Sequence, residues 1–289
     1  MINIAVLIVS YNPDDRLVDS INNLKGINSI NTILIVDNSE CENSVILKIR
    51  NVNKVQVVRN GENIGIAAAQ NKGMELLHEY GFKWVLTLDH DTIVYEGLID
   101  KYIDFISKNN CRNIGILCTD YYDIGTGKNK FGCNSPQEIC ETISSGSLLN
   151  MEIFKKIGGM KEFYFIDQVD NEYCYRVRKK QYKIIVLPGA DMEHRLGNIR
   201  ICHFGEKEFC LYNQPPIRTY YRTRNTILFI REYTDTELER VKKRELLKDF
   251  VRIIFEKQRF KKYKMFVMGL VDGIKYKLKE TSYEKSSMN

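Results

Sequence analysis

The sequence predicts an α/β fold, with a Rossmann-like, mostly parallel sheet flanked by helices and a helical C-terminal extension. Three observations support this prediction. Short apolar runs alternate with segments whose apolar residues recur at helical spacing, which is typical of βαβ units. Polar residues cluster directly after several of these runs. The pattern changes after residue 120, and from about residue 217 the chain is helical in pattern and basic.

The first 120 residues contain five predicted strands and the helices between them. The run at 3–11 is apolar throughout, as expected of a strand that is buried on both faces. Leu17, Ile21 and Leu24 then recur at helical spacing, and Gly26 is a typical helix end. The further strands are predicted at 32–39, 55–60, 84–89 and 113–120, and the further helices at 45–50, 67–80 and 97–109.

The elements after residue 120 are less regular. A Gly-, Asn- and Tyr-rich loop comes first, and residues 141–159 have the pattern of a strand followed by a helix. A helix is predicted at 170–182, a strand at 183–194 and a loop over most of 195–220. We therefore expect one domain at 1–216, with halves at 1–120 and 121–216, and a basic helical extension at 217–289.

The composition limits the classes of function. The 289 residues are 44% hydrophobic and 28% charged, which is ordinary for a folded domain. The net charge of +6 suits a polyanionic ligand or an acidic membrane surface, but it is too small to indicate a nucleic-acid partner. Eight cysteines without a CxxC pair argue against a zinc ribbon. Cys118 and Cys174 lie in apolar stretches, where a free thiol behaves as a small hydrophobe.

The sequence also lacks the usual targeting and nucleotide-binding motifs. It has no basic leader and no run of 18 apolar residues, so we expect a reduced, cytoplasmic protein without a membrane span. The segment YDIGTGKNK resembles a P-loop, but Asn129 replaces the Ser or Thr that would hold magnesium, and the leading glycine is missing. No GxGxxG follows the first strand, so neither a P-loop NTPase nor a Rossmann dehydrogenase is supported.

The segment TLDHDT places two acids at the carboxyl end of a predicted strand, where parallel sheets bind their ligands. In an extended backbone Asp89 and Asp91 point to the same side, and His90 points to the other. Such a pair suits a hard divalent cation that holds a diphosphate. A solvated turn is an equally supported interpretation. His194 ends another predicted strand and is either a third ligand or a hydrogen-bonded loop histidine.

Two further segments combine acidic or basic residues with a predicted helix start. Asp167, Asp170 and Glu172 precede a run of bases, and they either complement the helix dipole or supply a general base for an acceptor hydroxyl. Arg222 and Arg224 stand at the entry to a later helix, where they either clamp phosphate or form a solvated basic face. These residues alone leave both alternatives open.

Seven motifs follow one another along the chain: VLIVSYN, ILIVDNS, NIGIAAAQNKG, WVLTLDHDT, ISSGSLLN, FIDQVDNEYCYRVR and MEHRLG. Together they resemble the family 2 inverting glycosyltransferases with a GT-A fold, and most closely the bacterial rhamnosyltransferases that build surface polysaccharides. The resemblance covers roughly residues 3–230. Each motif is weak alone, but seven in the same order are specific.

The resemblance implies a nucleotide-binding half at 1–120 and an acceptor half at 121–216. It implies that Asp37 accepts a hydrogen bond from the pyrimidine base and that Gly65 allows a close backbone approach. Mg²⁺ or Mn²⁺ would be held by Asp91, Asp89 and His194. The implied nucleotide-sugar-binding residues are Ser10, Tyr11, Asn12, Asp37, Asn38, Asn63, Gly65, Asn71 and Asp89, together with the candidate phosphate ligands Arg222 and Arg224.

In the family the catalytic base usually sits in a Glu-Asp-x-Asp pattern before a helix. Here the corresponding residues are Val169-Asp170-Asn171-Glu172, so the resemblance makes Asp170 the base, with Asp167 and Glu172 as alternates. The base would deprotonate an acceptor hydroxyl as that oxygen attacks the anomeric carbon from the face opposite the leaving group. The anomeric centre would be inverted without a covalent enzyme intermediate.

The expected reaction is transfer of L-rhamnose from dTDP-L-rhamnose to a glycan or lipid-linked oligosaccharide acceptor, in capsule, O-antigen or cell-wall polysaccharide synthesis. The alternatives are a UDP-sugar donor and a non-catalytic nucleotide- or glycan-binding scaffold. A nucleotidyltransferase is disfavoured, because SYNPDD is not the Gly-rich loop that this class carries after its first strand. The basic, partly apolar C-terminal region is expected to pack on the domain, to form a homodimer, or to contact the inner face of the plasma membrane peripherally.

Overall fold

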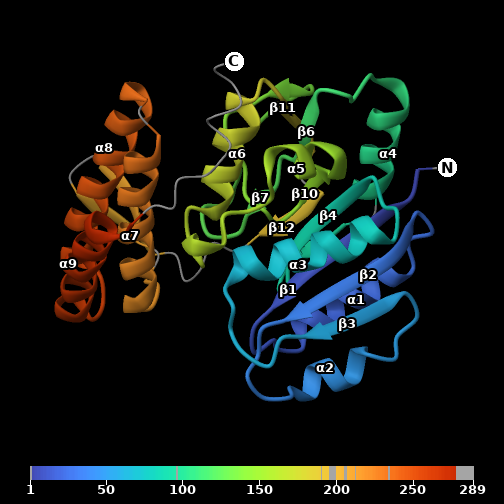
Figure 1. The fold of residues 1–289 in the computed structure, drawn as a ribbon, viewed down its shortest axis with the longest axis horizontal. Coiled ribbons are helices and arrows are strands. Elements are labelled where there is room, and N and C mark those ends of the chain that lie inside the picture. The colour runs from blue at the N-terminus through green and yellow to red at the C-terminus, as the bar shows by residue number, and fades with distance from the viewer. Residues whose placement is uncertain are drawn as a thin grey trace. The chain divides into compact units, whose positions relative to one another are not determined.

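A mixed sheet organises the first of the two units into which the chain divides, residues 1–201 and residues 202–289 (Figure 1). The computed structural model describes residues 2–95, 97–189, 191–194, 200–204, 207–211, 213–233 and 235–277. In spatial order, the strands of the large sheet are β3 (Val55–Arg59), β2 (Ile30–Asp37), β1 (Ile4–Ser10), β4 (Trp84–Asp89), β10 (Ser147–Asn150), β6 (Ile114–Thr119), β11 (Lys183–Leu187) and β9 (Gln137–Glu138).

Strand direction confirms the mostly parallel sheet that the sequence predicts. Strands β3, β2, β1 and β4 are parallel to one another, and so are β6 and β11. Strand β10 runs antiparallel between β4 and β6, and β9 runs antiparallel to β11. A smaller sheet contains β5 (Ile93–Val94), β12 (Met192–His194), β7 (Tyr122–Asp123) and β8 (Lys128–Asn129), in this spatial order.

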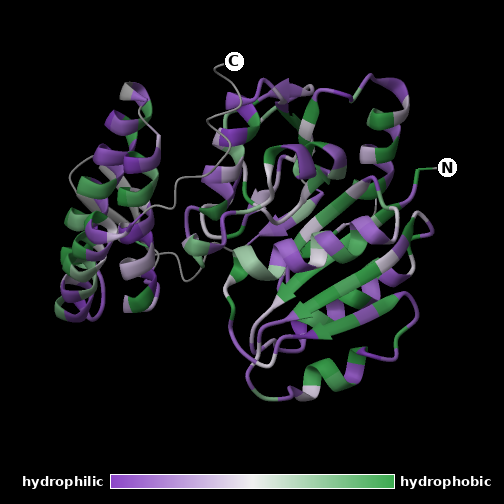
Figure 2. Ribbon diagram, viewed as in Figure 1, coloured by the Kyte–Doolittle hydropathy of each residue, from purple (hydrophilic) through white to green (hydrophobic). Residues whose placement is uncertain are grey.

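Helices cover both faces of the large sheet, because its central strands are apolar on both sides. Ile4, Val6 and Ile8 face the buried residues of α1 (Arg16–Lys25), α2 (Ser44–Ile49) and α4 (Leu98–Lys108). The opposite face meets α3 (Ile66–Glu79), α5 (Met151–Ile157) and α6 (Val169–Lys179). Figure 2 shows β1, β2 and β4 of the large sheet as mainly hydrophobic ribbons. Burial of each large aliphatic side chain contributes roughly 1.5–3 kcal/mol to folding.

The small residues at the start of α3 let this helix lie close to the sheet. Ala67 and Ala69 are fully buried. One turn further on, a Cβ atom on Gly73 would collide with the side chain of Leu7 in β1. Helix α3 can therefore approach β1 more closely than side chains of ordinary size would permit.

Two predictions for the region after residue 180 are wrong. The strand predicted at 183–194 is two strands, β11 and β12, because the chain turns at Pro188 and Gly189 (φ 108°) and β12 joins the smaller sheet. The loop predicted over 195–220 contains β13 (Arg200–Phe204) and β14 (Lys207–Leu211), which pair with each other. These strands are too short for their side-chain periodicity to stand out in the sequence.

The second unit contains α7 (Pro216–Glu232), α8 (Thr236–Arg252), the short 3₁₀ helix η2 (Ile253–Phe255) and α9 (Arg259–Lys275). Helix α9 packs closely on α7 through Gly269 and Gly273, where a Cβ atom would lie 2.6 Å from the Tyr220 carbonyl oxygen and 2.8 Å from Ile227 Cβ. The boundary predicted at residue 217 lies at the start of α7, whereas the second unit begins at residue 202. The predicted domain division stays a prediction. No helix in the described part of the chain combines the length and hydropathy that a membrane span requires.

Candidate active site

The register of the parallel strands brings polar residues into one row at their carboxyl ends. Ser10 pairs with Asp37, and Asp37 pairs with Arg59. The Asp37 side chain is fully buried: its Oδ1 accepts hydrogen bonds from Ser10 Oγ (2.9 Å) and Ser39 Oγ (2.7 Å), while Oδ2 lies 3.5 Å from Arg59 Nε. A buried carboxylate needs such partners, and here they hold it in one orientation.

Asn38 connects this row to the loop before α3. Its Nδ2 donates to the Gly65 carbonyl oxygen (3.1 Å), and its Oδ1 accepts from Asn60 Nδ2 (2.7 Å). Asn63 Oδ1 accepts from the Gly65 N–H group (3.1 Å). The predicted residues Asp37, Asn38, Asn63 and Gly65 therefore belong to one hydrogen-bonded region.

Gly65 is required by a contact within the protein. Its φ of 85° and ψ of 161° lie in a region that is essentially restricted to glycine. A Cβ atom here would lie 2.6 Å from the Phe165 ring and 2.8 Å from its carbonyl oxygen. The next residue, Ile66, donates its N–H group to that same carbonyl oxygen (2.7 Å). The loop before α6 thus rests on the N-terminus of α3.

Asn71 and Gln70 join α3 to the second half of the first unit. Asn71 Oδ1 accepts from the Met160 N–H group (2.7 Å), and its Nδ2 donates to the Met160 carbonyl oxygen (2.8 Å) and to Glu162 Oε1 (2.9 Å). Gln70 Nε2 donates to Ser144 Oγ (2.5 Å). The contacts of Asn71 thus hold a loop, and its predicted role in nucleotide binding stays a prediction.

Tyr11 and Asn12 lie just beyond the end of β1. The Tyr11 side chain is 44% exposed, and its hydroxyl lies 3.4 Å from Glu40 Oε1. Asn12 has a positive φ of 45°, and its N–H group donates to Ser39 Oγ (2.8 Å). The turn after β1 is therefore fixed by the same serine that contacts Asp37.

The TLDHDT segment is a turn from residue 90 onward. Strand β4 ends at Asp89, and the Thr92 N–H group donates to the Asp89 carbonyl oxygen (3.2 Å). The expectation that Asp89 and Asp91 share a side because the backbone is extended is therefore wrong, and so is its corollary for His90. Ser145 Oγ accepts from the Asp89 N–H group (3.0 Å) and fixes the end of the strand.

The three predicted metal ligands divide into two groups. His194 is almost completely buried at the end of β12, and its Nδ1 lies 4.0 Å from Asp89 Oδ2. The Tyr121 ring packs edge-on against the imidazole, with the ring centroids 5.7 Å apart. Asp91 instead faces Arg16, whose Nη1 lies 3.3 Å from Asp91 Oδ2. Within the described residues, no three His, Cys, Asp or Glu side chains form a preassembled metal-binding group.

Arg16 at the start of α1 contacts the predicted metal ligand Asp91, and the sequence analysis did not single it out. Asp14 holds its guanidinium through Nε (3.0 Å) and Nη2 (2.9 Å). The hydrogen bond from Arg16 lowers the pKa of Asp14, and the same bond raises the pKa of Arg16. Both residues lie in NPDDR, directly after the first strand, which is the signal that could have identified them.

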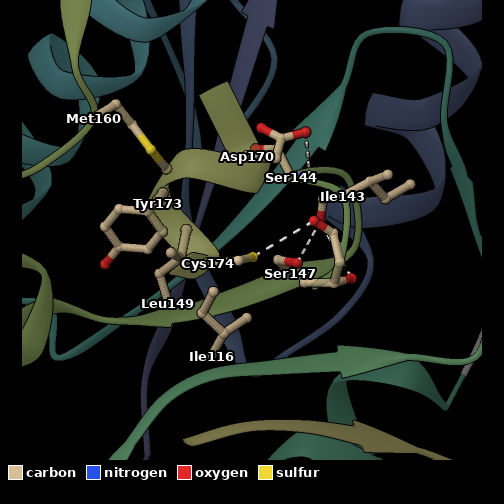
Figure 3. A pocket seen from close by; sticks show the side chains of 10 residues that line it. Ile116, Ile143, Ser144, Ser147, Leu149, Met160, Asp170, Tyr173 and Cys174 are labelled. Atoms are coloured by element: carbon tan, nitrogen blue, oxygen red, sulfur yellow. Dashed lines mark hydrogen bonds between the residues drawn. The ribbon is translucent and has the colours of Figure 1, made fainter. Parts of the chain in front are cut away.

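Asp170 lies in the first turn of α6, as the sequence predicts. Its Oδ2 accepts from the Ser144 N–H group at 3.1 Å. Asp170 and Ser144 line a small cavity of about 10 Å³ together with Tyr173 and Cys174 (Figure 3), which is room for about one water molecule. Burial raises the pKa of the Cys174 thiol, so this cysteine stays protonated at neutral pH and packs as an apolar residue.

Glu172, one of the two alternate bases, is a buried structural anion. Its side chain is 0% exposed, and Oε1 lies 2.6 Å from Arg176 Nε and 3.3 Å from Lys161 Nζ. Arg176 also donates from Nη2 to Glu172 Oε2 (2.9 Å). Asp167, the other alternate, adopts a left-handed φ of 64° in the segment that leads into α6. The contacts of Glu172 argue against it as the base, and the assignment of Asp170 stays a prediction.

Arg222 and Arg224 lie on α7 in the second unit and have partners there. Arg222 Nε lies 3.1 Å from Asp249 Oδ2 on α8. Arg224 Nε donates to Asn225 Oδ1 (2.9 Å), and its guanidinium stacks over the Tyr221 ring at 4.9 Å. Their predicted binding to the nucleotide sugar stays a prediction.

A mostly parallel sheet with polar residues beyond the carboxyl ends of its strands is the arrangement of nucleotide-binding α/β proteins. Residues 5–159, more than half of the chain, match the model of Glycosyl transferase family 2. The chain therefore belongs to this glycosyltransferase family, as its motifs predict.

Individual relatives agree with this assignment. The chain is 29% identical to the dTDP-rhamnosyl transferase RfbF of Shigella flexneri, over 94% of this chain and 96% of that protein. It is similar in fold to residues 1–349 of S. aureus TarS in complex with UDP-GlcNAc, with a TM-score of 0.61 at 15% identity over 94% of this chain and 81% of that one. It also resembles GalNAc-T7 with UDP, GalNAc and Mn²⁺, with a TM-score of 0.60 at 16% identity over 83% and 50% of the two chains. A longer TarS structure matches with a TM-score of 0.56 at 14% identity over 98% of this chain, which spans 47% of that structure.

Proposed function

We propose that the chain transfers L-rhamnose from dTDP-L-rhamnose to a hydroxyl of a glycan or lipid-linked acceptor, with inversion at the anomeric carbon. One observation carries the catalytic part of this proposal. The N–H group of Ser144 holds Asp170, and the hydroxyl of the next residue, Ser145, holds Asp89. Neighbouring residues in a chain have Cα atoms about 3.8 Å apart, so the proposed base and the acidic turn are anchored at adjacent points.

The donor part of the proposal rests on the buried Asp37 row and on the similarity to RfbF. The family resemblance implies that the pyrimidine base lies at Asp37, whose side chain is fully buried and would have to become accessible to accept from the N3–H group of the base. Thymine and uracil both present this donor, so Asp37 does not distinguish dTDP from UDP. The 29% identity to a dTDP-rhamnosyl transferase over 94% of the chain favours dTDP-L-rhamnose.

The acidic turn suits Mg²⁺ or Mn²⁺. Carboxylate oxygens are the ligands that these ions prefer, and Mg²⁺ usually binds through one or two carboxylates, waters and substrate phosphates rather than a full protein cage. Asp91 already attracts a positive group, since Arg16 Nη1 lies 3.3 Å from its Oδ2. Asp91 and Asp89 would hold the metal with the diphosphate, and His194 would support Asp89. When bound, the ion would supply positive charge to the leaving diphosphate.

Asp170 carries out the proton transfer in the proposed mechanism. Its carboxylate accepts the proton of the acceptor hydroxyl while that oxygen forms a bond to the anomeric carbon. The bond from this carbon to the diphosphate oxygen breaks, and the nucleoside diphosphate leaves with the electron pair. A single displacement inverts the anomeric centre, and the hydrogen bond from Ser144 keeps Asp170 oriented throughout.

Donor hydrolysis tests this mechanism without a known acceptor, because water can replace the acceptor hydroxyl. We expect the protein to release dTDP from dTDP-L-rhamnose in the presence of Mn²⁺, and EDTA to abolish the release. Asp170→Asn should lower the rate at least a hundredfold while leaving donor affinity, measured by calorimetry, within about twofold. Asp167→Asn is the matched control and should retain the rate.

The same measurements separate the alternatives. Tighter binding and faster hydrolysis of UDP-sugars would replace the dTDP-L-rhamnose assignment with a UDP-sugar donor. Donor binding without hydrolysis, in a sample that also transfers no sugar to polysaccharide acceptor fractions, would favour a non-catalytic scaffold. Full activity of Asp170→Asn would rule out Asp170 as the base.

A further inference from the structure

The corner where α8 passes through η2 into α9 exposes an unusual number of large apolar side chains. Leu247 is 64% exposed and Phe260 is 79% exposed, and between them Val251, Ile254 and Phe255 are each 45–49% exposed. We call these five residues the apolar corner. They lie within fourteen consecutive residues, so they gather at one place in the second unit. Clustered exposed apolar residues mark interaction sites more often than scattered ones do.

Helix geometry turns the apolar corner away from α7. Leu247 and Val251 lie four residues apart and therefore on one side of α8, and Ile254 follows in η2. The other side of α8 contacts α7: Lys242 Nζ lies over the Phe229 ring at 5.4 Å, and Asp249 pairs with Arg222. Lys242 and Asp249 therefore face α7, whereas Leu247 and Val251 on the other side of α8 are 64% and 45% exposed.

Basic residues surround the apolar corner, and they lack acidic partners among the described residues. Lys248, Lys257, Arg259 and Lys261 are all exposed, and none forms an ion pair in the part of the chain that the structure describes. The nearby acids are already engaged, since Asp249 pairs with Arg222 and Arg252, and Glu256 pairs with the buried Lys262. The corner is therefore apolar at its centre and positively charged at its edge.

The charge pattern selects one kind of partner. Between residues 213 and 277 there are 17 basic and 8 acidic residues, a net charge of +9, although the whole chain carries only +6. A second copy of this chain would bring like charges together across the interface. A nucleic acid would pair with the bases but would leave Phe260 and Leu247 without apolar contacts. An anionic lipid surface satisfies both features, since headgroups attract the bases and the acyl boundary accepts the apolar side chains.

We propose that the apolar corner and its four basic residues dock the protein onto an anionic membrane surface. The aromatic ring of Phe260 enters the boundary between headgroups and acyl chains, while Arg259, whose guanidinium lies 5.2 Å from that ring centroid, meets lipid phosphate. The membrane is contacted from one side and is not crossed. This inference holds whichever sugar the protein transfers.

Vesicle flotation with the full-length protein tests the proposal. We expect the protein to float with vesicles that contain phosphatidylglycerol, and not with pure phosphatidylcholine vesicles. The binding should weaken strongly at about 1 M salt, where the Debye length falls to about 3 Å. Replacing Lys257, Arg259 and Lys261 by Gln should lower the partition coefficient about fivefold for each charge removed.

Two single substitutions distinguish membrane contact by Phe260 from a general effect of removing an exposed aromatic side chain. Phe260→Ser should lower the partition coefficient about tenfold or more, because the lost apolar burial is worth roughly 1.5–3 kcal/mol. Tyr80→Ser removes another exposed aromatic side chain (53% exposed, at the end of α3) and should leave the partition unchanged. In Phe260→Trp, the new indole should fluoresce at shorter wavelength when phosphatidylglycerol vesicles are added.

Several results would overturn the proposal. One is equal flotation with neutral and anionic vesicles, or no flotation with either. Another is an equal loss of binding in Phe260→Ser and Tyr80→Ser. If light scattering shows that Phe260→Ser converts a dimer into a monomer, the apolar corner belongs to an interface between copies instead. Donor hydrolysis in solution should be the same in Phe260→Ser and in the unmodified protein, so this test is independent of the proposed reaction.

Discussion

The guanidinium of Arg16 lies 3.3 Å from Oδ2 of Asp91, although 75 positions separate the two residues in the chain. The contact gives Asp91, the acid expected to bind the metal, a positive partner supplied by the protein. Asp14 holds Arg16 in place by accepting hydrogen bonds from Nε and Nη2 of the guanidinium. A metal ion that binds Asp91 must therefore compete with this arginine or displace it.

We predict that Arg16→Gln binds Mn²⁺ more tightly when no donor is present. The ion pair between Arg16 and Asp91 is partly exposed, with side-chain exposures of 47% and 27%, so it contributes at most about 1 kcal/mol. The affinity for Mn²⁺ should therefore rise about fivefold or less. Titration followed by Mn²⁺ electron paramagnetic resonance measures the affinity. Arg50→Gln removes an exposed arginine that pairs with Glu42 at 3.7 Å and should change nothing. Weaker Mn²⁺ binding in Arg16→Gln would contradict this interpretation.

Neutralising Glu172 should lower the free energy of unfolding much more than neutralising Asp170. Glu172→Gln leaves Arg176 and Lys161 without their buried counter-ion, and breaking a buried pair typically costs about 3–5 kcal/mol. Asp170 is partly exposed, so Asp170→Asn should change the free energy of unfolding by less than about 1 kcal/mol. Urea denaturation followed by circular dichroism measures both. A stable Glu172→Gln protein without activity would instead favour Glu172 as the reactive group.

Gly65→Ala should destabilise the first unit more than Gly61→Ala. Both glycines have positive φ values, 85° and 72°, so each substitution introduces backbone strain of roughly 1–2 kcal/mol. A Cβ atom on Gly65 would also collide with Phe165, whereas nothing lies within 4 Å of the corresponding position on Gly61. The difference between the two unfolding free energies measures the contact with Phe165 together with the extra backbone strain at Gly65, whose ψ of 161° lies in a region essentially restricted to glycine. Equal values would mean that the loop before α6 moves aside at little cost.

Thiol labelling should separate the cysteines by burial. Burial raises the pKa of Cys118 to about 12, and it raises the pKa of Cys174 as well. Because only the thiolate reacts and a raised pKa keeps the thiol protonated, iodoacetamide should not modify either residue between about pH 7 and 9. The exposed Cys41 and Cys140 should be modified. Mass spectrometry of tryptic peptides gives the result, and rapid labelling of Cys118 in the folded protein would contradict it.

Local pattern was enough to predict much of the fold. The apolar run that became β1 is buried along almost its whole length, because a strand with helices on both faces must be apolar at successive positions. The start of α6 before Asp170 was also predicted, since acids before a basic run complement the helix dipole. The division of 183–194 into two strands was missed although Pro188 and Gly189 are a strong local turn signal, because β12 has only three residues and pairs with a strand distant in the sequence.

Contacts between distant segments could not be predicted in this way. The pairing of Arg16 with Asp91 depends on how α1 lies beside the end of β4, which no local pattern encodes. Glu172 was named as a candidate base because of its position, but its burial against Arg176 depends on the packing of α6. The geometry of Asp89 and Asp91 was wrong for a simpler reason: the strand ends at Asp89, two residues before Asp91, so the backbone between them is a turn and alternation does not apply.

The hydrogen bonds that join α3 to the loops around Asp170 limit which segments can be exchanged between related enzymes to make a chimera. Gln70 contacts Ser144, Asn71 holds Met160, and Ile66 donates to Phe165. A chimera cut at residue 120 would take α3 from one parent and all of these partner residues from the other. Exchange of acceptor preference between relatives should therefore succeed only when α3 is transplanted together with the loops at 144 and 159–168.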